Sequence, residues 1–291
     1  MLWIIVAVIA IDAVLRLIVL KSDTRFDFRK SDTSNSNTLL VYLPGILADG
    51  VQSSLLMVPT WQQYGDVLLV SYDGKRFKPQ SISQDVAEWI KNRKRYDKVV
   101  FIGSSLGGLL AYDTEARLTI GGVHDIDVDF LLLAAPTEWG DLKGPGKVSP
   151  LMYLWWAGPI SNATTGKLFL KALFQKPKDD NIEDGVDRKE LEQRVREAQS
   201  TPFSVYADQI RYVLGHGRPP EGSLIGIDAV FVSFERDEIV AEQAHRSWKP
   251  AFGGTLPLIK SDMTHVGYNE MPKASIRSFE LAFAELDLKK G

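Results

Sequence analysis

Ser105 lies between a predicted strand and a predicted helix, where a serine could act as a nucleophile. Residues 98–102 are mainly β-branched or aromatic, as in a strand buried on both faces, and residues 109–118 keep apolar side chains at helical spacing. Between them, Gly103-Ser104-Ser105-Leu106-Gly107 has the pattern Gly-x-Ser-x-Gly, which is too short for an ordinary loop. The strand must therefore turn directly into the helix, and this turn strains the backbone and exposes the serine hydroxyl.

Small residues surround this serine, and a helix begins directly after it. Gly103, Gly107 and Gly108 would let neighbouring segments pass close to the turn. The unpaired N–H groups of the helix N-terminus could hold an oxyanion. A glycine-rich turn with an incidental serine is the alternative, because 23 glycines make a chance match to the pattern plausible.

The strand, the Gly-x-Ser-x-Gly turn and the helix together resemble the α/β-hydrolase superfamily, and the resemblance covers about residues 38–288. It implies a mainly parallel sheet with helices on both faces. It also implies serine esterase or lipase chemistry, with Ser105 as the nucleophile and a catalytic acid and a histidine following it in that order. A serine at the turn argues against a dehalogenase or an epoxide hydrolase, which resemble this fold but carry an aspartate there.

The resemblance assigns His265 as general base, because it alone of the four histidines directly follows a late predicted strand. The others lie in a glycine-rich acidic turn, in the loop that leaves an insertion, and in a predicted surface helix: His124, His216 and His245.

Asp237 takes the place of the acid, since 237–240 reads Asp-Glu-Ile-Val where the family often shows Gly-x-x-Asp-x-Ile-Val. Phe234 departs from the glycine of that pattern. Asp237 would orient the imidazole and stabilise its cation. The rival acids are Glu235, Glu238 and Asp262.

Two backbone N–H groups should form the oxyanion hole. The resemblance assigns one to Leu106, which follows the nucleophile, and the other to Ile46. The superfamily usually has His-Gly-x at this second place, whereas this chain has Pro44-Gly45-Ile46, which keeps the amide of Ile46. A tight turn without a catalytic role is the alternative for this loop.

The remaining pattern predicts an alternation of strands and helices in one domain, residues 38–291. The further predicted strands are 38–43, 67–72, 127–134, 227–234 and 256–259, with a short edge strand at 24–28. The further predicted helices outside the insertion are 54–64, 83–93, 241–248 and 273–286.

The strand–helix rhythm breaks over residues 138–222, which we call the insertion and expect to form a lid. It ends in two helical patterns, 189–199 and 203–214. Its aromatic cluster includes Trp155 and Trp156, which would line an acyl or aryl pocket or else fill the core of the lid itself.

Residues 1–20 are almost wholly apolar, and this length just spans a bilayer as a helix. A cleavable signal peptide fits poorly, since no basic region precedes the segment. We expect a membrane anchor followed by a polar linker, 21–37. A helix packed on the domain or a partner is the alternative. Lys21, Arg25, Arg29 and Lys30 follow the segment, which favours a cytoplasmic catalytic domain.

Composition narrows the function further. A net charge of −3 gives no basic field for nucleic acid, so no nucleic-acid partner is expected. The absence of cysteine excludes disulfides and a cysteine nucleophile. We expect hydrolysis of a small-molecule acyl ester, with no metal or organic cofactor. The alternatives are an acyltransferase or peptidase using the same triad, and a membrane-tethered binding protein that has the fold without turnover.

Overall fold

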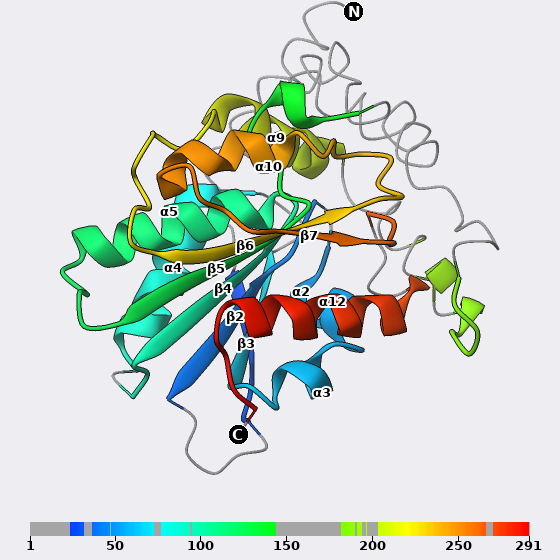
Figure 1. Ribbon diagram of the computed structural model, residues 1–291, viewed down its shortest axis with the longest axis horizontal. Coiled ribbons are helices and arrows are strands. Elements are labelled where there is room, and N and C mark those ends of the chain that lie inside the picture. Colours follow the sequence, from blue (N-terminus) through cyan, green and yellow to red (C-terminus); the bar gives the residue numbers. More distant parts are fainter. Residues whose placement is uncertain are drawn as a thin grey trace, which may run out of the picture.

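A seven-stranded sheet forms the centre of the protein in the computed structural model, in the order β1-β3-β2-β4-β5-β6-β7 (Figure 1). The structure describes residues 24–31, 37–46, 48–72, 77–93, 95–143, 182–189, 191–193, 196, 203–265 and 270–290. The strands are β1 (Thr24–Arg29), β2 (Thr38–Leu43), β3 (Asp66–Tyr72), β4 (Lys98–Ser104), β5 (Asp127–Leu133), β6 (Asp228–Phe234) and β7 (Leu258–Ser261).

All neighbouring strands are parallel except at one edge, where β1 pairs antiparallel with β3. This confirms the predicted mainly parallel sheet and the predicted edge strand. The sheet thus begins within residues 21–37, the stretch predicted as a linker. In a parallel sheet the carboxyl ends of the strands lie along one side, which is where loops carry functional groups in such folds.

Helices cover both faces of the sheet. They are α2 (Gly50–Ser54), α3 (Val58–Trp61), α4 (Pro79–Lys91), α5 (Gly107–Ile120), α9 (Phe203–His216), α10 (Ala244–Trp248) and α12 (Pro272–Glu285). Figure 1 shows α3 and α12 on the opposite side of the sheet from α5 and α10. Trp61 of α3 packs edge-on against Phe279 of α12, with ring centroids 5.1 Å apart. On the other face, Arg117 of α5 donates to Ser83 of α4 at 2.7 Å.

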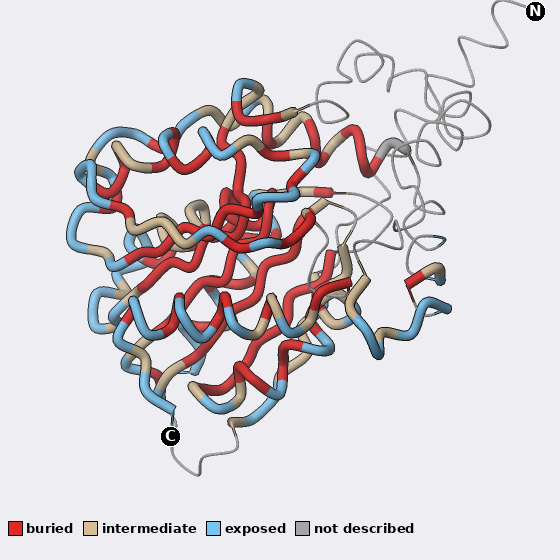
Figure 2. Tube along the Cα trace, turned by 45° about the vertical axis from the view of Figure 1, so that its right-hand side comes forward, coloured by how far each residue is buried: buried red, intermediate tan, exposed pale blue. Residues whose placement is uncertain are grey.

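The central strands are buried on both faces, as the sequence of residues 98–102 predicts. All seven residues of β3 are buried, and so is β4 except for Lys98. Figure 2 shows this buried sheet beneath helices whose outer sides are exposed. Strands of continuous apolar residues fit this position because neither face meets water.

One predicted helix, 54–64, is wrong. The structure has two short helices in this region instead, α2 and α3. Each has its own N-terminal signal, at a position other than the predicted start. Asp49 accepts from the backbone N–H groups of Val51 and Gln52, so α2 begins earlier. Pro59 lies in the first turn of α3, where its missing N–H costs nothing, and a second helix starts there.

The predicted exposure of His245 is also wrong. Its helix is shorter than predicted, and most of its side chains, including that of His245, are buried. The ring Nε2 lies 2.7 Å from the Leu256 carbonyl oxygen, and the ring packs against Phe231 with centroids 5.6 Å apart. The other predicted elements are confirmed with shifts of up to four residues at their ends, including α9 in the insertion.

The predicted anchor, residues 1–20, and the aromatic pair Trp155 and Trp156 lie outside the described residues. Within the described part of the chain, no helix has the length and apolar character that crossing a bilayer requires. The predicted helix 189–199 is described only in part, and its described residues 189, 191–193 and 196 are helical.

Candidate active site

Ser105 occupies the sharp turn that the sequence predicts, between β4 and α5. Its φ is 51°, in the left-handed region that side chains other than glycine rarely adopt. Its N–H donates to the Leu133 carbonyl at 2.9 Å, which ties the turn to the end of the neighbouring strand β5. The strained turn is therefore held from the sheet side.

Close backbone approaches explain the glycines around Ser105. A Cβ on Gly107 would lie 1.9 Å from the Leu43 carbonyl oxygen of β2. A Cβ on Gly103 would lie 2.6 Å from the Cα of Gly108, where the chain folds back on itself. Real Cβ atoms do not approach other atoms so closely, so this turn requires glycine at both positions. The prediction that neighbouring segments pass close to the turn is confirmed.

The structure brings Ser105, His265 and Asp237 into one hydrogen-bonded chain. The Ser105 Oγ lies 3.1 Å from His265 Nε2, and His265 Nδ1 lies 2.8 Å from Asp237 Oδ2. A carboxylate only accepts, so Nδ1 carries a ring proton, and an Nε2 without a proton would accept from the serine hydroxyl. All three side chains are largely buried, with the Asp237 side chain 2% exposed and the His265 side chain 15% exposed.

Asp237 is fixed by its own loop. Its second oxygen, Oδ1, accepts from the backbone N–H groups of Ile239 at 2.7 Å and Val240 at 2.8 Å. This turn leaves Oδ2 for the imidazole, so the carboxylate has a partner on each oxygen and one orientation.

None of the rival residues occupies the same position. Asp262 forms an ion pair with Arg236, whose Nε donates to Oδ1 at 2.5 Å, and both side chains are exposed. Glu235 and Glu238 are exposed as well. His124 is exposed, while His216 and His245 have the other partners described here.

The loop assigned to the oxyanion hole lies against Ser105. A Cβ on Gly45 would be 3.1 Å from Ser105 Cβ and 3.7 Å from its Oγ. Among the described residues, the N–H groups of Ile46 and Leu106 have no hydrogen-bond acceptor. Their role as oxyanion donors stays a prediction.

One buried tyrosine bonds to this loop, and a second lies in β2, the strand that precedes it. The Tyr72 hydroxyl donates to the Pro44 carbonyl at 3.3 Å, and burial raises its pKa well above the ordinary value. Burial likewise raises the pKa of Tyr42 to about 12, and its hydroxyl lies 3.2 Å from that of Ser53. Both phenols are therefore neutral at physiological pH, and Tyr72 keeps the proton that it donates to Pro44.

Residues 235–240, the loop that carries Asp237, are called the acid loop here. Sequence reasoning missed the segment that packs against this loop and holds it. Asp141 is buried and accepts from the hydroxyls of Thr137 and Ser247, at 2.9 and 2.7 Å. Leu142 then pairs with Val240 of the acid loop. The Lys143 ammonium donates to the main-chain carbonyl of Asp237 at 2.9 Å. No local pattern indicates the contacts of Asp141 with Ser247, of Leu142 with Val240 or of Lys143 with Asp237, because each joins positions about a hundred residues apart.

The segment that carries His265, which we call the histidine loop, is also held by a contact that the sequence did not indicate. Thr264, next to His265, donates to the buried carboxyl of Glu270 at 2.6 Å. Burial raises the pKa of Glu270, and this hydrogen bond opposes the rise. The Glu270 carbonyl accepts from Glu183 N–H at 2.8 Å, and the Glu183 carboxylate caps α12 at Lys273 N and Ala274 N.

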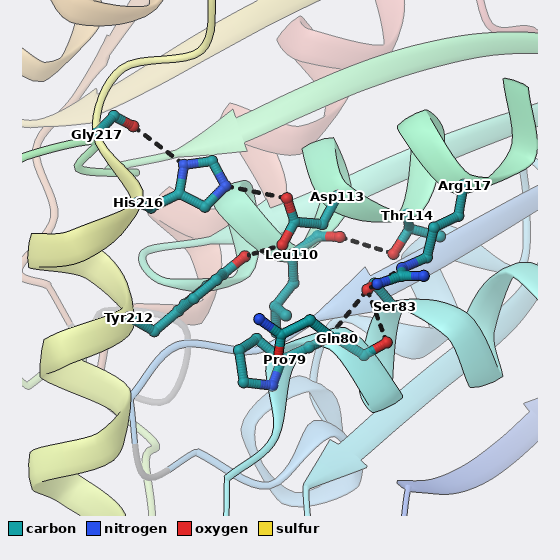
Figure 3. A network of polar contacts seen from close by, with 10 residues as sticks. All are labelled: Pro79, Gln80, Ser83, Leu110, Asp113, Thr114, Arg117, Tyr212, His216 and Gly217. Atoms are coloured by element: carbon teal, nitrogen blue, oxygen red, sulfur yellow. Dashed lines mark hydrogen bonds and ion pairs between the residues drawn. The ribbon is translucent and has the colours of Figure 1, made fainter. Parts of the chain in front are cut away.

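A further polar network joins α9 to α5, the helix that follows Ser105 (Figure 3). Asp113 of α5 accepts from the Tyr212 hydroxyl at 2.7 Å and lies 3.0 Å from His216 Nε2. The other ring nitrogen of His216 lies 3.0 Å from the Gly217 carbonyl oxygen. The insertion is thus bound to α5, the helix after Ser105, by paired polar groups.

Comparisons with known proteins support the fold at low sequence identity. No family model matches the sequence, and no curated protein matches it. The enol-lactonase from Burkholderia xenovorans LB400 has a similar structure, with a TM-score of 0.68 at 15% identity, over 90% of this chain and 97% of that chain. MenH from S. aureus has a TM-score of 0.64 at 15% identity, over 90% of this chain and 98% of that chain.

A thermophilic esterase from Thermogutta terrifontis gives a TM-score of 0.62 at 12% identity, over 91% of this chain and 94% of that chain. These likenesses, with the sheet order and the turn at Ser105, show that the chain has the α/β-hydrolase fold.

Among the described residues, no group of three or more His, Asp or Glu side chains could hold a metal ion.

Proposed function

We propose that this protein is a serine hydrolase that cleaves a carboxylic ester or thioester through an acyl-enzyme on Ser105. The observation that supports it is the hydrogen-bonded chain from Ser105 Oγ through His265 to Asp237, at 3.1 and 2.8 Å. The similar proteins include an esterase, and others named as a thioesterase and an enol-lactonase, which agrees with this reaction class. Because fold alone does not fix chemistry, the proposal rests on the site.

In the proposed reaction, Ser105 Oγ attacks the acyl carbonyl while His265 Nε2 takes its proton. Asp237, held by its own loop, stabilises the imidazolium that forms. The N–H groups of Ile46 and Leu106 would hold the oxyanion of the tetrahedral intermediate. His265 then gives the proton to the leaving alcohol or thiol, and water attacks the acyl-enzyme with His265 again as base.

Labelling by a fluorophosphonate, followed by turnover of p-nitrophenyl esters of increasing chain length, tests the nucleophile and the pocket together. Ser105→Ala should abolish labelling, and Ser105→Ala or His265→Ala should each lower kcat by several orders of magnitude. The double variant should be little worse than either single one, because the two residues act as one unit. Asp237→Asn should also be severe, since it disturbs the tautomer of His265.

His124→Ala is the matched control, because His124 is exposed and removed from the site; it should retain wild-type activity. Additive losses in the double variant would contradict the triad. A wild-type protein that neither labels nor cleaves any ester would instead favour a binding protein with this fold. Faster product formation when an alcohol or amine acceptor is added would indicate acyl transfer, and cleavage of peptides would indicate a peptidase.

A further inference from the structure

The loop that carries Asp237 is held along its backbone on two sides. On one side, Glu235 N–H donates to the Ser261 carbonyl at 2.8 Å and Arg236 N–H to the Met263 carbonyl at 3.1 Å. On the other side, Lys143 N–H donates to the Ile239 carbonyl at 2.7 Å. The loop therefore lies between the histidine segment and the first residues of the insertion.

The carbonyl of Asp237 itself is not part of either backbone ladder. Among the described residues, its donor is the Lys143 ammonium, at 2.9 Å in a partly buried setting. A hydrogen bond from a charged donor is shorter and stronger than a neutral one, and partial burial limits competition from water. The ammonium thus fixes the peptide plane that follows the carboxylate-bearing residue.

Fixing this plane constrains the carboxylate. Asp237 Oδ1 is bound by the N–H groups of Ile239 and Val240, which lie directly beyond the same peptide. Rotation of that peptide would carry both donors away from Oδ1 and turn Oδ2 away from His265. A small displacement of a catalytic group is costly in rate, because the reaction depends on alignment.

We infer that Lys143 is a positioning residue of the proposed reaction, holding the Asp237 carbonyl and through it the carboxylate against His265. This inference rests on the proposed function. It assigns to the first residues of the insertion a part in the chemistry, separate from any contact with substrate. The backbone contacts of Leu142 and Lys143 do not depend on the lysine side chain, so a substitution changes one contact and leaves the ladder in place.

The test compares Lys143→Met with Lys143→Arg, using kcat and KM for a p-nitrophenyl ester, the fluorophosphonate labelling rate and the melting temperature. Lys143→Met should lower kcat and the labelling rate about ten- to a hundredfold, with KM within about twofold, as expected when a charge-assisted contact is lost. Lys143→Arg should recover most of the loss, because a guanidinium can donate to the same carbonyl. Lys290→Met, which removes an exposed lysine paired with Glu280, is the charge-matched control and should match wild type.

Each alternative outcome decides against the inference. If Lys143→Met keeps wild-type kcat, or if Arg is no better than Met, the ammonium does not position the acid. If the loss disappears once the assay temperature is lowered in step with the melting temperature, Lys143 only stabilises the fold. If Lys143→Met does not fold, Lys143→Gln takes its place and is compared with Lys143→Arg and wild type in the same measurements. If wild-type protein reacts with neither the fluorophosphonate nor the ester, both the proposed function and this inference are wrong. If wild type is active and Lys143→Met is equally active, only the inference is wrong.

Discussion

The contact between α9 and α5 should make stability depend on pH through His216. Both ring nitrogens of His216 face groups that only accept: the Asp113 carboxylate and the Gly217 carbonyl, each at 3.0 Å. Both nitrogens must therefore carry protons in this arrangement, and the ring is an imidazolium. Burial opposes this charge, but the hydrogen bonds that the ring donates to Asp113 and Gly217 outweigh it and raise the pKa of His216 above its ordinary value.

The sign of the effect follows from this raised pKa. In the unfolded chain, His216 has the ordinary histidine pKa of about 6.5. The stabilisation is complete below that pH and disappears as the pH rises through the higher folded-state pKa. Tyr212 does not interfere, because burial and the nearby Asp113 raise its pKa well above the ordinary value and keep it a neutral donor. Tyr72 adds to this rise, and Arg117 of α5 opposes it.

The magnitude follows from the exposure of the pair. The side chains of His216 and Asp113 are 13% and 26% exposed. A hydrogen bond between charged groups contributes about 1.5–3 kcal/mol, and partial exposure reduces this to about 1–2 kcal/mol of coupling. For a chain of this length, that coupling corresponds to a change of about 2–3 °C in the melting temperature.

A double-mutant cycle measures this coupling directly. Urea unfolding of wild type, Asp113→Asn, His216→Gln and the double variant should give about 1–2 kcal/mol of coupling near pH 6, and less than about 0.5 kcal/mol near pH 9. His124→Gln, an exposed histidine without such partners among the described residues, should show no such dependence. Equal coupling at both pH values, or a larger one near pH 9, would refute the imidazolium.

Three further outcomes can be checked by simpler measurements. Gly107→Ala should destabilise the fold by more than about 3 kcal/mol in urea unfolding, because its Cβ would overlap the Leu43 carbonyl oxygen, whereas Gly215→Ala, with open space in α9, should be neutral or stabilising. Glu183→Ala should cost about 1 kcal/mol by removing the cap of α12, and Glu183→Gln should cost less. We also propose that residues 1–20 anchor the protein: carbonate-washed membranes should retain the full chain and release a chain starting near residue 23, and external protease should leave a cytoplasmic domain uncut.

The sequence predicts the parts of the site that are governed by local pattern. The turn at Ser105 is forced by a strand and a helix with no loop between them, and the structure shows it with a φ of 51°. The family resemblance, the pattern at 237–240 and the position of His265 after a late strand select the residues that the structure brings together. These predictions succeed because each depends on a few adjacent residues and on the ends of parallel strands.

The braces could not be predicted in this way. The Lys143 contact with Asp237, the capping of α12 by Glu183 and the pairing of Asp113 with His216 each join residues about ninety to a hundred positions apart. Nothing in the neighbourhood of a lysine or a glutamate in the sequence specifies such a partner, because tertiary packing decides it. The buried His245 was mispredicted for the same reason, since its exposure depends on β6 and on the segment around Leu256 rather than on its own helix.

The two ends of the insertion set limits on protein engineering. Its first residues bind the acid loop through Lys143, its returning segment reaches the histidine loop through Glu183 and Glu270, and α9 binds the nucleophile helix at Asp113. Each contact lies on the loop or helix next to a different member of the proposed triad. A chimera that takes its insertion from another hydrolase should therefore be joined after Lys143 and before Glu183, so that the host keeps these contacts. Junctions placed at the sheet would replace all three at once, and the exchanged segment would then alter the alignment of the triad as well as the choice of substrate.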